Sequence, residues 1–425
     1  MKFPPALRAL NHRDFRRYYI GQAVSQTGSW MQSVAVVWLA YRLSGSPATT
    51  GLIGFLAMIP NLLITPFAGA LSDRVSRRSL LLVAQWVLFV HALLLTAMTL
   101  SGAISIAWLA LFAVVGGIFN AIEITTRHSF FAELIEERAD LPNAIALNSA
   151  NINATRLIGP AIGGVLIALA GEASCFGLNA LSYLAVIFQL RRISPRASAP
   201  TGPRLSFLAE LVAGWKFALG DPVIRPLVLM VGAVSFFINP YAVLTPAIAV
   251  QSFGQGAELH GLLISAVGIG ALANAVLLAR KESVSGLPSW ILLTSAMAAL
   301  GAAGFALLVP LQSVALSLLA MTGLGFGVMG TSAAVNTIIQ SVAQDHMRGR
   351  VVSVYSTFFT GAVPMGHLAA GWTAERIGAP RTFLLCGCAA AIAALVYLLS
   401  LPGLRRRLAR EWQSRGMMPH PPSSS

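Results

Sequence analysis

The chain has 425 residues, of which 56% are hydrophobic and only 10% charged, and its mean hydropathy is +0.73. Soluble domains carry roughly a quarter charged residues, so this composition excludes a soluble protein and predicts a polytopic membrane protein. The net charge of +14 comes from basic residues in short spacers between apolar runs, which argues against a nucleic-acid partner. The three cysteines lie in apolar segments without metal-ligand spacing, so we expect no disulfide, metal or other cofactor.

Twelve apolar segments are long enough to cross a bilayer, which takes roughly 20 residues. Because lipid offers no partners to backbone groups, we expect each segment to be a helix. The predicted fold is therefore an all-α polytopic membrane protein with twelve transmembrane helices in two six-helix pseudo-symmetric bundles. The spans are expected near residues 18–43, 51–72, 79–100, 105–127, 143–170, 174–191, 223–250, 259–280, 288–309, 313–340, 349–373 and 382–401.

The spacers between the spans alternate between a strongly basic set and a nearly neutral set. The basic set holds 25 of the 29 Lys and Arg residues, the other set holds Arg42, Arg376 and Arg381, and Arg156 lies inside the fifth span. The positive-inside rule places the basic set, and with it both termini, in the cytoplasm. We expect a multi-pass protein of a bacterial cytoplasmic (inner) membrane, with its first apolar run retained as a span rather than cleaved as a signal peptide.

The longest spacer divides the spans six and six. We expect an N-terminal six-helix bundle at 1–192, a cytoplasmic linker at 193–222, a C-terminal bundle at 223–402 and a basic cytoplasmic tail at 403–425. Within the linker, the side of a helical segment that carries Phe207, Leu208, Leu211 and Trp215 predicts an interfacial helix. The segments 164–171 and 371–378 share a glycine spacing, which suggests the repeated halves typical of transporters.

A charged motif, GALSDRVSRR, separates the second and third spans. Together with the twelve spans and the central loop, it resembles the signature of the major facilitator superfamily. The residues that match this signature are Gly69, Asp73, Arg74, Arg77 and Arg78, whereas Ser76 and Ser79 depart from it. The resemblance implies a conformational gate: Asp73 would latch the two halves, with the start of the eleventh span near Arg350 and with Arg127 as partners. The alternative is a surface Asp that caps the start of the third span or neutralises its arginines.

A second motif, GPAIGG in the fifth span, matches the end of a signature associated with exporters of the superfamily. The upstream glycines of that signature are replaced by Ala146 and Thr155. Together with LPNAIALNS and RGRVVSVY, the motif is similar to a bacterial branch that includes the enterobactin exporter. The predicted helix-packing residues are Gly159, Pro160, Gly163 and Gly164.

Two positions inside the spans carry charge and are candidates for coupling. Glu123 and Arg127 are four residues apart, so they share a helix face, with Glu123 about 6 Å inside the end of the fourth span. A carboxylate inside the membrane suggests proton carriage, and a static ion pair is the alternative. Arg156 lies near the bilayer centre, where it would either attract an anionic substrate group or make a structural pair. The next coupling candidates are His91 and His367.

Polar side chains at helical spacing predict a central substrate cavity. Small polar residues also hold membrane helices together, so for any single one packing is favoured over ligand binding. The candidate cavity residues are Gln22, Gln26, Trp30, Asn120, Asn239, Asn336, Gln340 and Thr360.

These features predict a secondary active transporter that works by alternating access rather than an enzyme. The favoured function is proton-coupled efflux of a small organic molecule, either drug-like or siderophore-like. The alternatives are a proton-coupled uptake symporter or, from another class, a non-transporting membrane receptor or scaffold. The expected partners are a small-molecule substrate, protons and the lipid bilayer, and the protein is expected to be a monomer.

Overall fold

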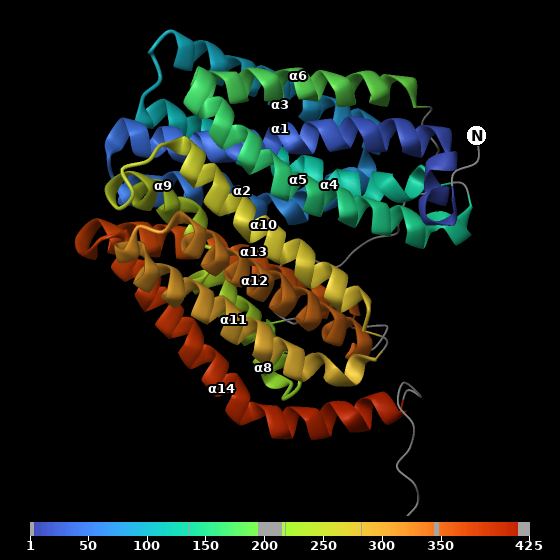
Figure 1. Cartoon of the computed structure of the whole chain (residues 1–425). Coiled ribbons are helices and arrows are strands. Elements are labelled where there is room, and N and C mark those ends of the chain that lie inside the picture. The colour runs from blue at the N-terminus through green and yellow to red at the C-terminus, as the bar shows by residue number, and fades with distance from the viewer. Residues whose placement is uncertain are drawn as a thin grey trace, which may run out of the picture. The chain divides into compact units, whose positions relative to one another are not determined.

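The computed structural model describes residues 4–135, 137–193, 215, 216, 218–281, 283–343 and 348–414, which form helices joined by short turns (Figure 1). In chain order, the helices are η1 (Pro5–Asn11), α1 (Arg13–Ser44), α2 (Pro47–Arg74), α3 (Arg77–Leu100), α4 (Ile106–Glu133), η2 (Arg138–Asp140), α5 (Leu141–Ala170), α6 (Glu172–Arg192), α8 (Ile224–Phe237), α9 (Tyr241–Gln251), α10 (Ala257–Ala279), η3 (Val284–Gly286), α11 (Leu287–Leu308), η4 (Val309–Leu311), α12 (Val314–Val342), α13 (Arg348–Ile377) and α14 (Ala379–Ser414).

Ten helical stretches of the described residues are long and apolar enough to cross a membrane, which confirms the predicted all-α membrane class. Helices α8 and α9 together form one of these stretches, Ile224–Gln251, close to the seventh predicted span. The predicted first and eleventh spans correspond to α1 and α13, which are not among the ten. Both carry polar side chains at helical spacing, which lower their mean hydropathy. The count of twelve spans stays a prediction.

Helix α4 extends beyond the predicted end of the fourth span at residue 127 and stops only at Glu133. Glu123 therefore lies ten residues, or about 15 Å, from the helix end rather than the 6 Å expected. The polar residues near position 127 predicted the start of a loop, but Thr126 and Arg127 are buried. Phe130 and Phe131 also pack into a hydrophobic core, so this turn belongs to the packed bundle.

By its internal packing the chain divides into two compact units. Unit 1 comprises Met1–Pro203 with Ala242–Gly268, and unit 2 comprises Arg204–Tyr241 with Ile269–Ser425. The division predicted from the spans assigns α9 and α10 wholly to the second bundle, and that division stays a prediction. The difference arises because α9 and the first part of α10 pack against helices of unit 1.

In unit 1, α1 packs against α5 and α6, α3 packs against α4 and α6, and α2 packs against α4. We call the end that holds η1, the start of α1 and the α4–α5 connection the basic end. A cluster of buried apolar side chains closes it, including Phe15, Tyr18, Phe130, Phe131 and Leu190. Its elements come from distant parts of the sequence, so this cluster fixes the ends of α1, α4 and α6 relative to one another.

The segment η1 is anchored to the α4–α5 connection at the basic end. Both carboxylate oxygens of Asp140 are engaged: Oδ1 lies 2.8 Å from Nε of Arg8, and Oδ2 lies 2.9 Å from Nε2 of His12. The backbone N–H of Ala9 donates to Oδ1 of Asn143 at 2.9 Å. The segment η1 is therefore part of the folded unit.

Helix α5 approaches two neighbours closely at its glycines. A Cβ added to Gly159 would lie 2.5 Å from Cβ of Trp30 on α1, and one added to Gly163 would lie 3.2 Å from Cα of Met31. On the side facing α10, a Cβ on Gly164 would lie 2.8 Å from the carbonyl oxygen of Ala257. Small residues are what permits such helix approach in a membrane protein, since they let backbones meet.

In unit 2, α11 packs against α12 and α14, and α13 packs against α8. Of the four residues that define the predicted interfacial helix of the linker, only Trp215 is described. Its ring centroid is 4.7 Å from that of Phe358. The segment predicted as a basic tail, 403–425, is helical in its first part, because α14 continues through Pro402 to Ser414 and bends (Figure 1). Its place in the cytoplasm stays a prediction. Leu404, Leu408 and Trp412 are buried on one face of this extension, and Trp412 donates to Oγ of Ser341 at 2.9 Å.

Candidate functional site

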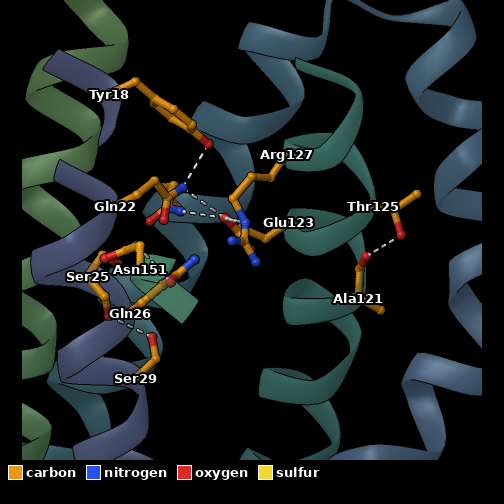
Figure 2. Close-up of polar contacts among 11 residues, drawn as sticks. Tyr18, Gln22, Ser25, Gln26, Ser29, Ala121, Glu123, Thr125, Arg127 and Asn151 are labelled. Carbon is orange, nitrogen blue, oxygen red and sulfur yellow. Dashed lines mark hydrogen bonds and ion pairs between the residues drawn. The ribbon is translucent and has the colours of Figure 1, made fainter. Parts of the chain in front are cut away.

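A buried polar cluster lies between α1, α3 and α4 of unit 1, and Figure 2 shows how its side chains converge on Glu123. Nε of Arg127 lies 3.1 Å from Oε1 of Glu123. The same oxygen accepts hydrogen bonds from Nε2 of Gln22 at 3.2 Å and from Nε2 of Gln85 at 3.5 Å. Gln22 also donates to the hydroxyl of Tyr18 at 2.7 Å. Glu123 and Arg127 thus form the ion pair that their four-residue spacing predicted.

The ion pair is largely removed from solvent, because the side chains of Arg127 and Glu123 are only 11% and 9% exposed. Burying one partner alone would leave an uncompensated charge, whose cost in proteins is about 3–5 kcal/mol. Nη1 of Arg127 and Oε1 of Gln85 have no hydrogen-bond partner among the described residues. The cluster therefore keeps unused hydrogen-bonding capacity next to a titratable group.

The polar face of α1 continues from Gln22 to two further contacts with α5. Nδ2 of Asn151 donates to Oε1 of Gln26 at 3.0 Å, and the guanidinium carbon of Arg156 lies 5.8 Å from the ring centroid of Trp30. Gln22, Gln26 and Trp30 are spaced four residues apart, so they form one stripe along the helix. This stripe joins the Glu123 cluster to the surroundings of Arg156.

Two of the predicted gate residues, Arg77 and Arg78, make polar contacts within unit 1. Arg77 forms an ion pair with Glu133 of α4, whereas Arg78 donates from Nε to the carbonyl of Leu190 at 2.7 Å and from Nη2 to that of Arg191 at 3.0 Å. These two arginines therefore tie α3 to α4 and α6. Gly69 lies in α2, and a Cβ there would meet Cγ2 of Thr125 at 4.0 Å. The side chains of Asp73, Arg74 and Arg350 lie outside the described residues.

The other predicted cavity residues are spread over both units. Asn120 is exposed on α4 in unit 1. In unit 2, Nε2 of Gln340 donates to Oδ1 of Asn336 at 3.1 Å on α12, and both Asn239 and Thr360 are half-buried.

A groove of about 490 Å³ in unit 1 is lined by none of the predicted cavity residues. Its lining is mainly apolar and comes from α1, α5 and α6: Ala23, Val24, Thr27, Gly28, Met31, Ile162, Leu166, Leu178 and Ser182. This is a different face of α1 from the stripe through Gln22, Gln26 and Trp30.

The sequence did not indicate Tyr18, Gln85 and Asn151 as members of the buried polar cluster and of the polar stripe that continues it along α1. Gln85 is a polar residue within an otherwise apolar run, which is the one signal that could have found it. The two alternative coupling candidates, His91 and His367, are both buried. His91 has its Nε2 2.8 Å from the carbonyl oxygen of Phe112, which gives it a structural contact between α3 and α4.

The fold and the buried polar layer define a multi-pass membrane transporter. A family model described as transmembrane secretion effector matches residues 5–424, so the chain belongs to this family of the major facilitator superfamily. This confirms the resemblance inferred from the sequence, and it places the chain among transporters rather than enzymes.

Several characterised proteins are similar to the chain over most of its length. The multidrug efflux pump Tap of Mycobacterium tuberculosis is 28% identical over 398 residues, 90% of this chain and 92% of that protein. The enterobactin exporter EntS of Salmonella choleraesuis is 26% identical, with 93% and 94% covered. The staphyloferrin A transporter of Staphylococcus aureus is 24% identical, with 87% and 92% covered.

Solved structures agree with this fold. The crystal structure of a bacterial homologue of the iron transporter ferroportin, in an inward-facing state, has a TM-score of 0.72 and covers 92% of this chain and 98% of its own. The two sequences are 18% identical, so the likeness concerns the fold.

Proposed function

We propose that the protein is a secondary active transporter that exports a small organic molecule, drug-like or siderophore-like, in exchange for protons. The observation that carries the proposal is the buried ion pair between Glu123 and Arg127, surrounded by Gln22, Gln85 and Tyr18. Intramembrane carboxylates are rare and are by default candidates for proton relays. Export is supported by two of the three relatives, whose names state efflux or export.

In this proposal Glu123 alternates between a protonated and a deprotonated state. A neighbouring positive charge generally favours the ionised form of a carboxyl group, whereas burial without such a charge favours the neutral form. Glu123 would accept a proton when the pair opens and release it when the pair re-forms. Proton transfer is coupled to export if the ion pair opens in the outward-facing state of the alternating-access cycle and re-forms in the inward-facing state.

The proposed arrangement in the membrane has twelve spans, with α1 and α13 completing the ten apolar stretches. Both termini lie on the cytoplasmic side of a bacterial inner membrane, since 25 of the 29 basic residues fall on that side. The transporter is proposed to act as a monomer. Arg77 and Arg78 both have partners within unit 1, so neither is left to join the two halves. We therefore propose that the gate between the halves depends on Asp73.

The test uses everted membrane vesicles with an imposed pH gradient, acid inside. Candidate substrates are ethidium, a catecholate siderophore and an aromatic carboxylate, each compared with vesicles that lack the protein. We expect at least one of them to accumulate in the vesicles only when the gradient is present, and to leave when nigericin collapses it. Gradient-driven loss of substrate from the vesicles would instead support the uptake symporter.

A further inference from the structure

Helix α14 is longer than a bilayer is thick, and its last part is strongly basic. Its 36 residues extend over about 54 Å, whereas the hydrocarbon core of a bilayer measures about 30 Å. The last fourteen residues hold one acidic residue, Glu411, and four exposed arginines, Arg405, Arg406, Arg407 and Arg410. Their formal charge is therefore +3. This charge lies where the helix leaves the membrane.

The basic extension of α14 is held on its own unit, which fixes the direction of its arginines. Leu404, Leu408 and Trp412 are buried on one face, and Nε1 of Trp412 donates to Oγ of Ser341. Arg406 lies about 200° around the helix from Leu404, on the opposite face. The arginines are therefore presented outward by a helix that is already packed.

Two basic side chains from different helices of unit 2 converge on the start of α11. Nη2 of Arg405 on α14 donates to Oγ of Ser289. Nζ of Lys281, which follows the end of α10, lies 4.3 Å from the ring centroid of Trp290, a cation–π distance. Ser289 and Trp290 are consecutive residues, so a guanidinium and an ammonium flank the same turn of α11. Both basic side chains are exposed.

An exposed apolar surface continues from this turn along α11. Leu293, Leu300 and Leu307 are all exposed and are spaced seven residues apart, which places them on one face of the helix. Leu293 lies one helical turn beyond Ser289. A positive group at the end of a span, followed by an apolar stripe, matches the shape of an anionic phospholipid. A soluble anion would make no use of the leucines.

We propose that Lys281, Ser289 and Arg405 bind the phosphate group of an anionic phospholipid. The guanidinium supplies paired N–H donors that match a phosphate, and the ammonium adds a point charge. Trp290 lies at the level of the lipid interface, where tryptophan is enriched in membrane proteins, and the acyl chains run along the exposed leucines of α11. This proposal concerns a lipid partner and does not depend on the proposed transport function.

A lipid bound at this position would contact three elements of unit 2. These are the end of α10, the start of α11 and the extension of α14, which otherwise meet through the contacts of Lys281 and Arg405. A ligand that binds only the folded state stabilises it. Anionic lipid should therefore raise the midpoint of thermal unfolding, and it should do so less when the basic residues are replaced.

The test is lipid binding to the purified full chain in detergent, measured by native mass spectrometry. The probes are dioleoylphosphatidylglycerol, dioleoylphosphatidylcholine, which has the same chains without net charge, and glycerol phosphate, which has the charge without the chains. We expect the parent to bind its first phosphatidylglycerol at least tenfold more tightly than its first phosphatidylcholine. Glycerol phosphate should bind at least 100-fold more weakly than phosphatidylglycerol.

The double variant Lys281→Gln with Arg405→Gln should weaken phosphatidylglycerol binding at least tenfold and change phosphatidylcholine binding by less than twofold. The reason is that each basic residue near an anionic lipid surface contributes roughly fivefold to binding. Its smaller gain in thermal stability from phosphatidylglycerol provides a second readout.

A charge-matched control is Arg376→Gln with Arg381→Gln. Both arginines are exposed, at the end of α13 and the start of α14, and Arg376 also lies over an indole, that of Trp372 at 3.5 Å. The control removes two charges at the opposite end of α14, so its phosphatidylglycerol binding should stay within twofold of the parent.

If the Lys281 and Arg405 variant does not fold, judged by thermal unfolding without anionic lipid, Arg406→Gln with Arg410→Gln replaces it. These arginines lie on the side of α14 away from Leu404, and their loss should weaken phosphatidylglycerol binding at least fivefold.

Three results would overturn the lipid site. The first is a parent that does not prefer phosphatidylglycerol to phosphatidylcholine, and the second is a folded variant of the basic residues that keeps the full preference. The third is glycerol phosphate binding as tightly as phosphatidylglycerol, which would indicate a site for soluble anions.

Discussion

Glu123 receives its three polar contacts through a single oxygen atom, so replacing this residue tests charge and proton uptake together. The variant Glu123→Gln keeps the side-chain shape but has no titratable group. We expect it to abolish the response of transport to a pH gradient in everted vesicles while substrate exchange without a gradient remains measurable.

The conservative variant Glu123→Asp supplies the control, because it retains a carboxylate and should retain part of the gradient response. Since Glu123→Gln leaves Arg127 buried without its counter-charge, we also expect a lower thermal stability. Undiminished gradient-driven accumulation by Glu123→Gln would reduce Glu123 to a structural partner.

The sequence was sufficient to predict part of this site. The spacing of Glu123 and Arg127 predicted their pair, because residues four apart on a helix face the same way. The contacts of Gln85 and Asn151 could not be predicted, since they depend on which helices are neighbours and on how each is rotated. The depth of Glu123 differs from the prediction for a related reason: polar residues often mark the end of a membrane span, whereas here tertiary packing buries Thr126 and Arg127.

At the scale of elements, α5 and α10 approach each other closely in unit 1. A Cβ added to Gly261 would lie 2.5 Å from the carbonyl oxygen of Pro160, a distance that requires the backbone to move. Overpacking of this kind typically costs about 1–3 kcal/mol. We expect Gly261→Ala to lower the midpoint of thermal unfolding by at least about 3 °C in nanodiscs.

The matched control for this substitution is Gly304→Ala in α11. No heavy atom outside the local backbone lies within 4 Å of the Cβ position of Gly304. Alanine favours a helix over glycine by about 1 kcal/mol, so this variant should be as stable as the parent or slightly more stable. Equal destabilisation by both substitutions would show that α5 and α10 do not depend on this contact.

Helix existence was predictable for these elements, but helix ends were not. The extension of α14 beyond Pro402 was hidden by its arginines, which suggested a tail. Buried residues at helical spacing, Leu404, Leu408 and Trp412, define an amphipathic face that holds this extension on its unit.

At the scale of the whole molecule, the proposed topology makes α1 and α13 membrane spans despite their polar faces. Alkaline phosphatase is active only outside the cytoplasm, so fusions after Gly45 and after Gly378 should both be active. A fusion after Val75, between α2 and α3, should be inactive at equal expression. An inactive fusion after Gly45 would mean that α1 does not cross the membrane.

The proposed gate makes a separate prediction. Asp73→Asn should abolish or strongly reduce transport in vesicles while the amount of protein in the membrane is unchanged, because the substitution removes the charge of the latch. Asp14→Asn is a suitable control, since Asp14 lies at the same basic end in a partly exposed pair 3.8 Å from Arg17. Normal transport by Asp73→Asn would exclude the latch.

The anchoring of η1 has a consequence for the order in which the chain assembles during synthesis. Arg8 and Ala9 bond to residues 131 and 134 positions later in the sequence, at Ala139 and Asn143. A ribosome adds about 5–20 residues per second, so η1 emerges roughly 7–26 s before its partners exist. Docking of η1 must therefore wait until α1 to α4 and the α4–α5 connection have been made, so η1 reaches its final position at the basic end well after it is synthesised.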